Sequence, residues 1–249
     1  PFGEFITSNI TPDNETGIGR WSGEDFWQAL HHGKSKDGRY LYPAFPYTEY
    51  TKVTRPDADA IFAYLRSLPP VAQTNPPHKI RPPYDNQTLL FLWRKWYFKE
   101  GVYQPDKSKS DEWNRGNYLV QGLGHCNACH TPRNVWGASQ DDKLSGSKIV
   151  GTYWYAPSLI SPLEAGVGEW SIEDIVELLS TGINGHAVTS GPMATIVRQS
   201  LQYLSDEDMR SIAVYLQSLG EKQDHAKAPR KARKMPEQVR QYLALGEAV

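Results

Sequence analysis

Two stretches of the chain alternate apolar and polar residues with the period of a helix. After Thr54, and again after Ser205, apolar side chains recur at i, i+3, i+4 and i+7, which places them on one face of a helix. In both stretches an Asp follows the capping hydroxyl by three residues, in the first turn, where the helix dipole favours a carboxylate. The pattern predicts two amphipathic helices, with apolar positions Ala58, Ile61, Phe62 and Leu65 in one and Met209, Ile212, Ala213 and Leu216 in the other.

Each of these helices is preceded by another with clear limits. Ser22 and Ser171 each precede an Asp by three residues, which is the arrangement of a capping box. Gly33 and Gly182 provide natural ends, because glycine adopts the left-handed conformation that closes a helix. We therefore expect a second pair of helices that begin after these serines and end at these glycines.

The similarity extends to the loops, so the chain carries one folding unit twice. The segments NITP at 9–12 and GIGRWSGED at 17–25 return about 150 residues later as LISP at 159–162 and GVGEWSIED at 166–174. A nearly constant offset of this kind indicates duplicated units. We predict a mainly α fold built of tandem units, with short helices and long loops.

The predicted boundaries are a first unit over 1–70, a connector over 71–112, a second unit over 113–220 and, over 221–249, a charged linker followed by the start of a third unit. The connector has Pro-rich turns on both sides of an aromatic helix expected from Gln87 to Tyr97, and we expect it to pack across a surface. The run KAPRKARK at 227–234 favours a solvated linker over a docking patch. Because 241–246 resembles 115–119, we expect this sequence to be the interior of a three-unit protein.

Composition narrows the class of protein without choosing a function. The 249 residues carry a formal net charge of −1, so no nucleic acid is expected as a partner. The longest apolar run, 89–93, is far shorter than the roughly 20 residues that cross a bilayer, and the first residues do not have the pattern of a signal peptide. The 20 Gly and 18 Pro residues agree with short helices joined by long ordered loops.

The two cysteines lie in the stretch GLGHCNACHTPRN, residues 122–134. A zinc site would need further ligands at a suitable spacing, which the sequence does not offer. A thioredoxin-like dithiol normally follows a strand, and none is predicted here. The third possibility is covalent attachment of a c-type haem, for which C-x-x-C-H is the motif. In this interpretation Cys126 and Cys129 form thioethers with the haem vinyl groups and His130 binds the iron.

A haem held in this way needs a ligand on its second face, unless that face stays open for a small molecule. Methionine suits electron transfer because its thioether stabilises Fe(II). Met209 lies on an apolar helix face and Met235 in the charged tail, so we expect Met193, in a loop, to be this ligand. His186 is the alternative, whereas His125 is too close to the cysteines to reach the opposite face.

The surroundings of His130 can be predicted in outline. A neutral imidazole that binds iron donates its other N–H to an acceptor, which fixes the ring, and we expect that acceptor to be a backbone carbonyl in the turn at Pro132. The residues expected to form the wall of the haem pocket are Tyr155, Pro157, Leu159 and Trp170. Ordinary core packing is compatible with the same positions.

Four longer motifs carry a resemblance to a known family. They are NITPDxxTGIGxWSxxDF (9–26), LYPAFPYTxYTKV (41–53), WNRGxYLVxGLGHCxACHTPRN (113–134) and GPMAxxVxxSLQYLSDxD (191–208). Together they resemble the triple-haem cytochrome c subunit of periplasmic membrane-bound dehydrogenases, which include alcohol, gluconate, fructose and aldehyde dehydrogenases. The resemblance covers nearly the whole chain. It implies tandem cytochrome c-like domains, in which short helices and long loops are wrapped round haem.

The resemblance implies electron transfer. A catalytic dehydrogenase subunit, a quinoprotein or flavoprotein, would oxidise the substrate, and the cytochrome would pass electrons from haem to haem towards ubiquinone in the inner membrane, on the periplasmic side. Cys126, Cys129, His130 and Met193 would then serve the middle haem, with the first and third haem motifs outside this sequence. A peroxidase-like haem enzyme with an open second face and a thiol redox protein are the alternatives.

The second ligand of the first haem is not evident from the sequence. Residues 1–125 contain no methionine, and Phe45 stands where comparison with Met193 would place one. The candidates are His31, His32 and His78. A five-coordinate iron and a ligand further upstream are also compatible with the sequence.

Overall fold

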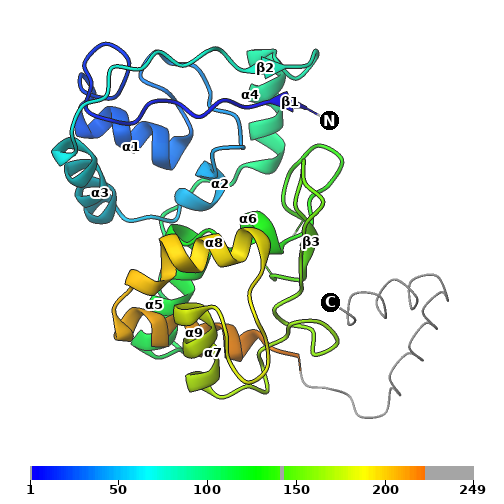
Figure 1. Cartoon of the computed structure of the whole chain (residues 1–249). Coiled ribbons are helices and arrows are strands. Elements are labelled where there is room, and N and C mark those ends of the chain that lie inside the picture. Colours follow the sequence, from blue (N-terminus) through cyan, green and yellow to red (C-terminus); the bar gives the residue numbers. More distant parts are fainter. Residues whose placement is uncertain (1, 141–142, 222–249) are drawn as a thin grey trace, which may run out of the picture.

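The computed structural model describes residues 2–140 and 143–221. Within these residues the chain is mainly helical, with two small antiparallel sheets and long ordered loops (Figure 1). The elements are β1 (Gly3–Glu4), α1 (Gly23–His32), α2 (Tyr47–Tyr50), α3 (Arg55–Ser67), β2 (Lys79–Ile80), α4 (Gln87–Tyr97), α5 (Asp111–Tyr118), the π-helical turn η1 (Leu119–Leu123), α6 (Asn127–His130), β3 (Ser147–Lys148), β4 (Tyr155–Ala156), α7 (Ile172–Thr181), α8 (Gly191–Gln199), the 3₁₀ turn η2 (Leu201–Tyr203) and α9 (Asp206–Leu219). The predicted mainly α fold is confirmed. Apart from Glu221, the predicted linker and third unit over 221–249, with Met235, lie outside the described residues.

The limits of α1 and α7 follow from the capping residues that the sequence indicates. The hydroxyls of Ser22 and Ser171 accept hydrogen bonds from the amide of the Asp three residues on, at 3.1 and 3.0 Å, and each Asp carboxylate accepts from its serine amide. Gly33 and Gly182 close the helices with φ of +57° and +86°. The two helices therefore begin and end at corresponding positions, as the repeat predicts.

The other predicted helices also form. Thr54 caps α3 and Ser205 caps α9, each through a hydroxyl that accepts from the amide three residues on. The aromatic helix α4 runs from Gln87 to Tyr97, as predicted. Asn86 caps it, because its side chain accepts hydrogen bonds from the first-turn amides. Local sequence thus determines where the helices start.

Apolar side chains gather in two clusters. The smaller lies between α1 and α3 and consists of Leu30, Val53 and Ala58. The larger lies between α5, η1, α7 and α9 and consists of Leu119, Val120, Leu144, Val167, Ile175, Ile212, Ala213, Tyr215 and Leu216. Leu123, the last residue of η1, packs against both clusters. Met209, which the sequence assigns to the core, is 3% exposed.

Several contacts join the N-terminal helices to the C-terminal ones. Tyr118 of α5 accepts from the Thr54 amide at 3.1 Å and donates to the Asp57 carboxylate, and α2 packs against η1. The connector helix α4 joins the same assembly, since Trp93 donates to the carbonyl of Trp136 at 2.9 Å. In the described part of the chain, no helix has both the length and the apolar character needed to cross a membrane.

Candidate functional site

The two cysteines and His130 lie on one helical turn. Cys126 directly precedes α6, and Cys129 and His130 are its last two residues. The amides of Cys129 and His130 donate to the carbonyl of Cys126 at 3.2 and 3.0 Å. Because residues at i, i+3 and i+4 of a helix share a face, the two thiols, both free of any disulfide, and the imidazole project from the same side.

The ring of His130 is fixed by a carbonyl from a distant segment. Its Nδ1 lies 2.8 Å from the carbonyl oxygen of Pro157; since a carbonyl only accepts, Nδ1 carries the proton and Nε2 keeps its lone pair. Burial lowers the pKa of His130, which favours the neutral ring. A neutral imidazole with Nε2 available is what an iron ligand requires. The predicted acceptor at Pro132 is wrong, because Nδ1 bonds the carbonyl of Pro157; the carbonyl of Pro132 accepts from the amide of Gln140 at 2.9 Å.

The hairpin of β3 and β4 brings Pro157 to this position. Ser147 pairs with Ala156 in the antiparallel register, and the amide of Gly146 donates to the carbonyl of His130 at 2.7 Å. Gly146 has a φ of +88°, and a Cβ there would lie 2.7 Å from the amide nitrogen of Ser158. A residue without a side chain therefore allows the segment after β4 to lie against the motif.

The other predicted wall residues have different surroundings. Tyr155 is 53% exposed, and its hydroxyl donates to Glu164 at 3.0 Å. Leu159 and Trp170 pack against the larger apolar cluster. Among the predicted wall residues, Pro157 is the one for which the structure gives a direct contact with His130.

A buried polar network, which sequence reasoning missed, fixes the motif from inside. Asn127 is 1% exposed; its side chain donates to Gln121 and accepts from Thr131 at 2.8 Å. Gln121 in turn donates to the hydroxyl of Tyr215 in α9 at 2.9 Å. The signal for this network was a polar residue between the two cysteines, a position whose burial the sequence alone does not reveal.

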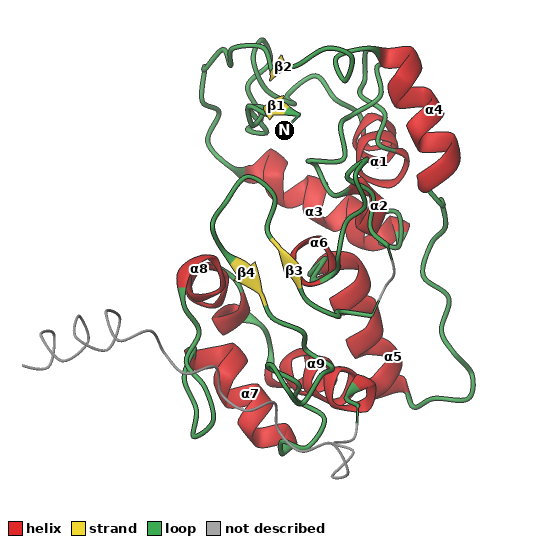
Figure 2. Cartoon of the chain, turned by 90° about the vertical axis from the view of Figure 1, so that its right-hand side faces the viewer, coloured by secondary structure: helices red, strands yellow, loops and turns green. Residues whose placement is uncertain are grey.

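Met193 lies in the first turn of α8 and not in a loop, which corrects the expectation. Pro192 is the second residue of this helix, where the N–H that proline lacks would have no partner within the helix. Gly191 has a φ of +53°, and a Cβ at this position would stand 2.5 Å from the nearest ring atom of Trp154. The absence of a side chain therefore lets the Trp154 ring pack against the start of α8. Figures 1 and 2 place α8 and α6 at the same level of the molecule.

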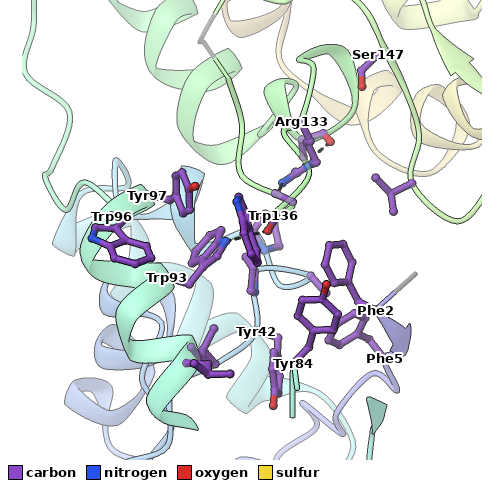
Figure 3. Close-up of a pocket in the computed structure, with 18 of the residues that line it drawn as sticks. Phe2, Phe5, Tyr42, Tyr84, Trp93, Trp96, Tyr97, Arg133, Trp136 and Ser147 are labelled. Atoms are coloured by element: carbon purple, nitrogen blue, oxygen red, sulfur yellow. Dashed lines mark hydrogen bonds between the residues drawn. The ribbon is translucent and has the colours of Figure 1, made fainter. Parts of the chain in front are cut away.

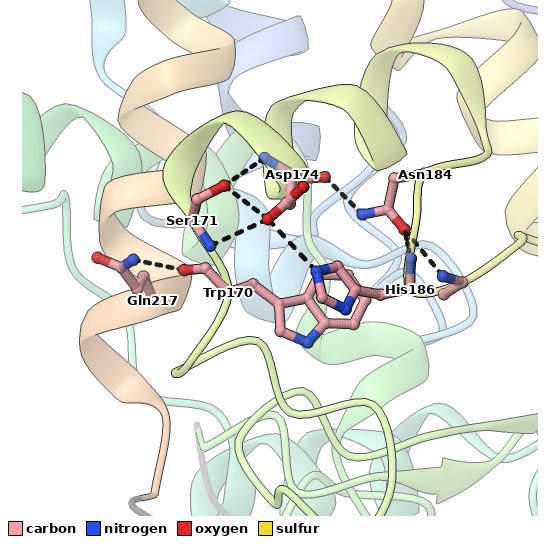
Figure 4. Close-up of polar contacts among 7 residues, drawn as sticks. Trp170, Ser171, Asp174, Asn184, His186 and Gln217 are labelled. Atoms are coloured by element: carbon pink, nitrogen blue, oxygen red, sulfur yellow. Dashed lines mark hydrogen bonds and ion pairs between the residues drawn. The ribbon is translucent and has the colours of Figure 1, made fainter.

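The alternative ligand, His186, is engaged with other residues (Figure 4). Its Nε2 lies 3.3 Å from the Asp174 carboxylate, and its ring stacks on Trp170 with centroids 4.6 Å apart. The carbonyl of Trp170 accepts from Gln217 at 2.7 Å. These contacts give His186 a role in tying the start of α7 to α9.

The thiols are not tuned for redox exchange. Burial raises the pKa of Cys126 to about 11 and also raises the pKa of Cys129. Both thiols are therefore protonated at neutral pH, whereas reactive dithiols have a lowered thiol pKa. This argues against the thiol redox protein.

A cavity of about 640 Å³ borders the motif loop (Figure 3). It meets the loop at His125 and Ala128 and is otherwise lined mainly by aromatic and apolar side chains. These come from the N-terminal segments, α4 and β3, and include Phe5, Tyr42, Pro43, Ala44 and Trp93. His125 also contacts Tyr50 edge to face, with ring centroids 5.3 Å apart.

The donor set on α6 fits a covalently attached haem. Two thiols and an imidazole share one helical face, and the imidazole has its Nδ1 proton bound and its Nε2 free. Together with the helical fold, this defines a c-type cytochrome.

Comparison with known proteins shows which c-type cytochromes the chain is similar to. It is 46% identical over 222 residues to a nicotinate dehydrogenase subunit of Pseudomonas putida, covering 88% of this chain and 18% of that protein. It is 42% identical to the gluconate 2-dehydrogenase cytochrome c subunit of Pantoea cypripedii, covering 89% of this chain and 52% of that one. A dihaem c-type cytochrome of Cereibacter sphaeroides is 38% identical, with 86% and 71% covered. No family profile matches the chain.

The chain belongs to the family of multi-haem c-type cytochromes that includes the cytochrome c subunits of alcohol, gluconate and fructose dehydrogenases. It spans about half the length of those subunits.

Proposed function

We propose that the chain is part of an electron-transfer cytochrome c subunit. When bound, haem c supplies a one-electron Fe(III)/Fe(II) couple. Cys126 and Cys129 would hold the porphyrin through thioethers, and His130, through Nε2, and Met193, through its thioether, would bind the iron. The observation that carries the proposal is the hydrogen bond from His130 Nδ1 to Pro157, 2.8 Å long, because it orients a neutral ring for iron on the turn that carries both thiols.

The names of the relatives support a partner and an electron acceptor. Their names describe subunits of nicotinate, gluconate, fructose and quinone-linked alcohol dehydrogenases. The chain would accordingly receive electrons from a catalytic dehydrogenase subunit, a quinoprotein or flavoprotein, and pass them towards ubiquinone at the periplasmic face of the inner membrane. Thioether attachment of haem outside the cytoplasm supports the periplasmic location.

The repeat supports a further haem in the N-terminal unit, over 1–70. Phe5 corresponds to Tyr155 in the repeat, and Pro43 and Ala44 directly precede Phe45, which stands where comparison with Met193 would place a methionine. Phe5, Pro43 and Ala44 all line the aromatic cavity. We propose that this cavity lies against the haem of the first unit, next to the loop that holds the middle one.

Peptide mass spectrometry tests the haem assignment at this motif, independently of any other haem in the protein. After haem maturation in the periplasm and acid–acetone extraction, the peptide that contains residues 122–133 should carry the mass of one haem. The double variant Cys126→Ser with Cys129→Ser should lose it. An unmodified wild-type peptide would contradict the proposal. Carbon monoxide should not bind the reduced iron at this motif, whereas rapid binding would favour the peroxidase-like alternative.

A further inference from the structure

Two adjacent histidines at the end of α1 lie beside a carboxylate from the connector. His31, His32 and Glu100 each offer one ligand atom, and these atoms lie within 4.8 Å of one another. His32 Nδ1 is 2.9 Å from Glu100 Oε2, and the two imidazole rings meet at 82° with centroids 4.6 Å apart. Two ring nitrogens and a carboxylate oxygen are ligands that zinc and related divalent ions take.

His31 has a buried nitrogen without a partner. The residue is 5% exposed, and its Nδ1 makes no hydrogen bond. A buried polar atom without a partner is unfavourable, whereas a metal ion would satisfy it.

The surrounding residues hold the cluster together. Thr51 is 1% exposed, and its Oγ1 accepts from the amide of Gly101 at 3.1 Å. This bond holds the segment that carries Glu100. Trp27 stacks on His31, with centroids 4.3 Å apart and ring planes 9° apart. The imidazole of His31 is thus positioned before any ion arrives.

The charges near the cluster act in both directions. Both histidines lie in the last turn of α1, where the helix dipole favours a cation, and Glu100 supplies a negative charge. The guanidinium of Arg94 opposes a cation; it donates to the carbonyl of His32 at 2.6 Å.

The repeat indicates that this cluster is not part of a haem site common to both units. Because Gly33 corresponds to Gly182, the counterparts of His31 and His32 are Ser180 and Thr181, which are not metal ligands of this kind. A histidine pair needed for every unit would recur in the second. The cluster therefore belongs to the N-terminal unit and its connector alone.

We propose that His31 Nδ1, His32 and Glu100 bind one divalent transition-metal ion of the zinc class. Zinc ligands bind at about 2.0–2.2 Å, so the three atoms draw together, and Glu100, whose side chain is 49% exposed, is free to move. The ion replaces the hydrogen bond between His32 and Glu100 and leaves a fourth position for water. Its effect is to fasten the connector to the end of α1.

Zinc titration of the haem-loaded protein tests the proposal. After dialysis against a chelator and re-equilibration with zinc chloride, elemental analysis should find one more bound zinc per chain in the wild type than in Glu100→Gln or His31→Gln. The exposed Glu177→Gln variant, in α7, is the matched control and should bind as the wild type does. Zinc should raise the Tm of the wild type and of the control, but not of Glu100→Gln.

Two outcomes would overturn the site. In the first, the wild type and the Glu100→Gln variant bind the same number of zinc ions. Because the Glu100 side chain is half exposed, this variant should fold normally. In the second, His31→Gln changes the ligand-sensitive bands of a haem, since His31 would then bind haem iron. An unchanged haem spectrum together with the loss of one zinc is the expected result.

Discussion

Gly116 of α5 lies directly against the backbone of Ser211 in α9: a Cβ at Gly116 would stand 1.9 Å from the carbonyl oxygen of Ser211. The two helices therefore cross at backbone contact. Because α5 continues through η1 to the cysteines, this crossing sets where the turn with Cys126, Cys129 and His130 lies relative to α9.

Substitution of Gly116 by Ala should destabilise the protein. The new methyl group overlaps a main-chain oxygen, and overpacking of this kind typically costs about 1–3 kcal/mol. Urea unfolding of the haem-loaded protein measures the difference. Gly185→Ala is the control, because no atom lies within 4 Å of the Cβ position at Gly185; equal losses in the two variants would show that the helix crossing is looser than described.

The two described methionines should respond differently to truncation. Met193→Ala should abolish the sulfur-to-iron charge-transfer band, lower the reduction potential and allow carbon monoxide to bind, because the thioether ligand is lost. Met209→Ala should keep the band but lose about 2–5 kcal/mol of stability, since Met209 is 3% exposed in the core. A retained band in Met193→Ala would exclude Met193 as the ligand.

Loss of the Asn127 side chain should weaken the support of the motif. Asn127→Ala removes the acceptor of the buried Thr131 hydroxyl and one of the donors to Gln121, and an unsatisfied buried polar group costs about 1–3 kcal/mol. Thermal unfolding of the haem-loaded protein should show the drop, and the exposed Asn14→Ala should not. If both variants melt together with the wild type, the network contributes nothing to stability.

The capping box of α1 should make stability depend on pH in the acid range. Hydrogen bonds from the Ser22 amide and from Lys36 lower the pKa of Asp25 from 3.8 to about 2. A carboxyl group with a depressed pKa in the folded state stabilises the protein above its unfolded pKa, and this contribution is lost as the pH falls through the folded pKa.

The Asp25→Asn variant measures this contribution. It should be less stable than the wild type at neutral pH by about 1 kcal/mol, and the difference should shrink between about pH 4 and about pH 2. Urea unfolding over this pH range checks it, with the exposed Asp85→Asn as the control. A difference that stays constant across the acid range would show that the charge of Asp25 does not matter.

Local signals in the sequence predicted the helices well. The capping residues Ser22, Thr54, Ser171 and Ser205 act within three residues of themselves, so their effect can be read without knowing the rest of the fold. The repeat supports each pair of helices, because equivalent signals recur at equivalent places. The motif C-x-x-C-H likewise needs only a single turn of helix.

Features that depend on distant segments were not predictable in the same way. The acceptor for His130 is Pro157 because the register of β3 with β4 brings it there, and that register is invisible from residues near the motif. Met193 lies in the first turn of α8 and not in the predicted loop, since the proline before it is compatible with the start of a helix. The burial of Asn127 and the meeting of His31 with Glu100 also depend on contacts between separate elements.

Leu123 is wedged between both apolar clusters and stands three residues before the first cysteine. Neither half of the molecule can loosen its packing without disturbing the other half through this side chain. The two repeated units should therefore unfold cooperatively, in a single calorimetric transition, although the repeat in the sequence suggests two domains that unfold independently.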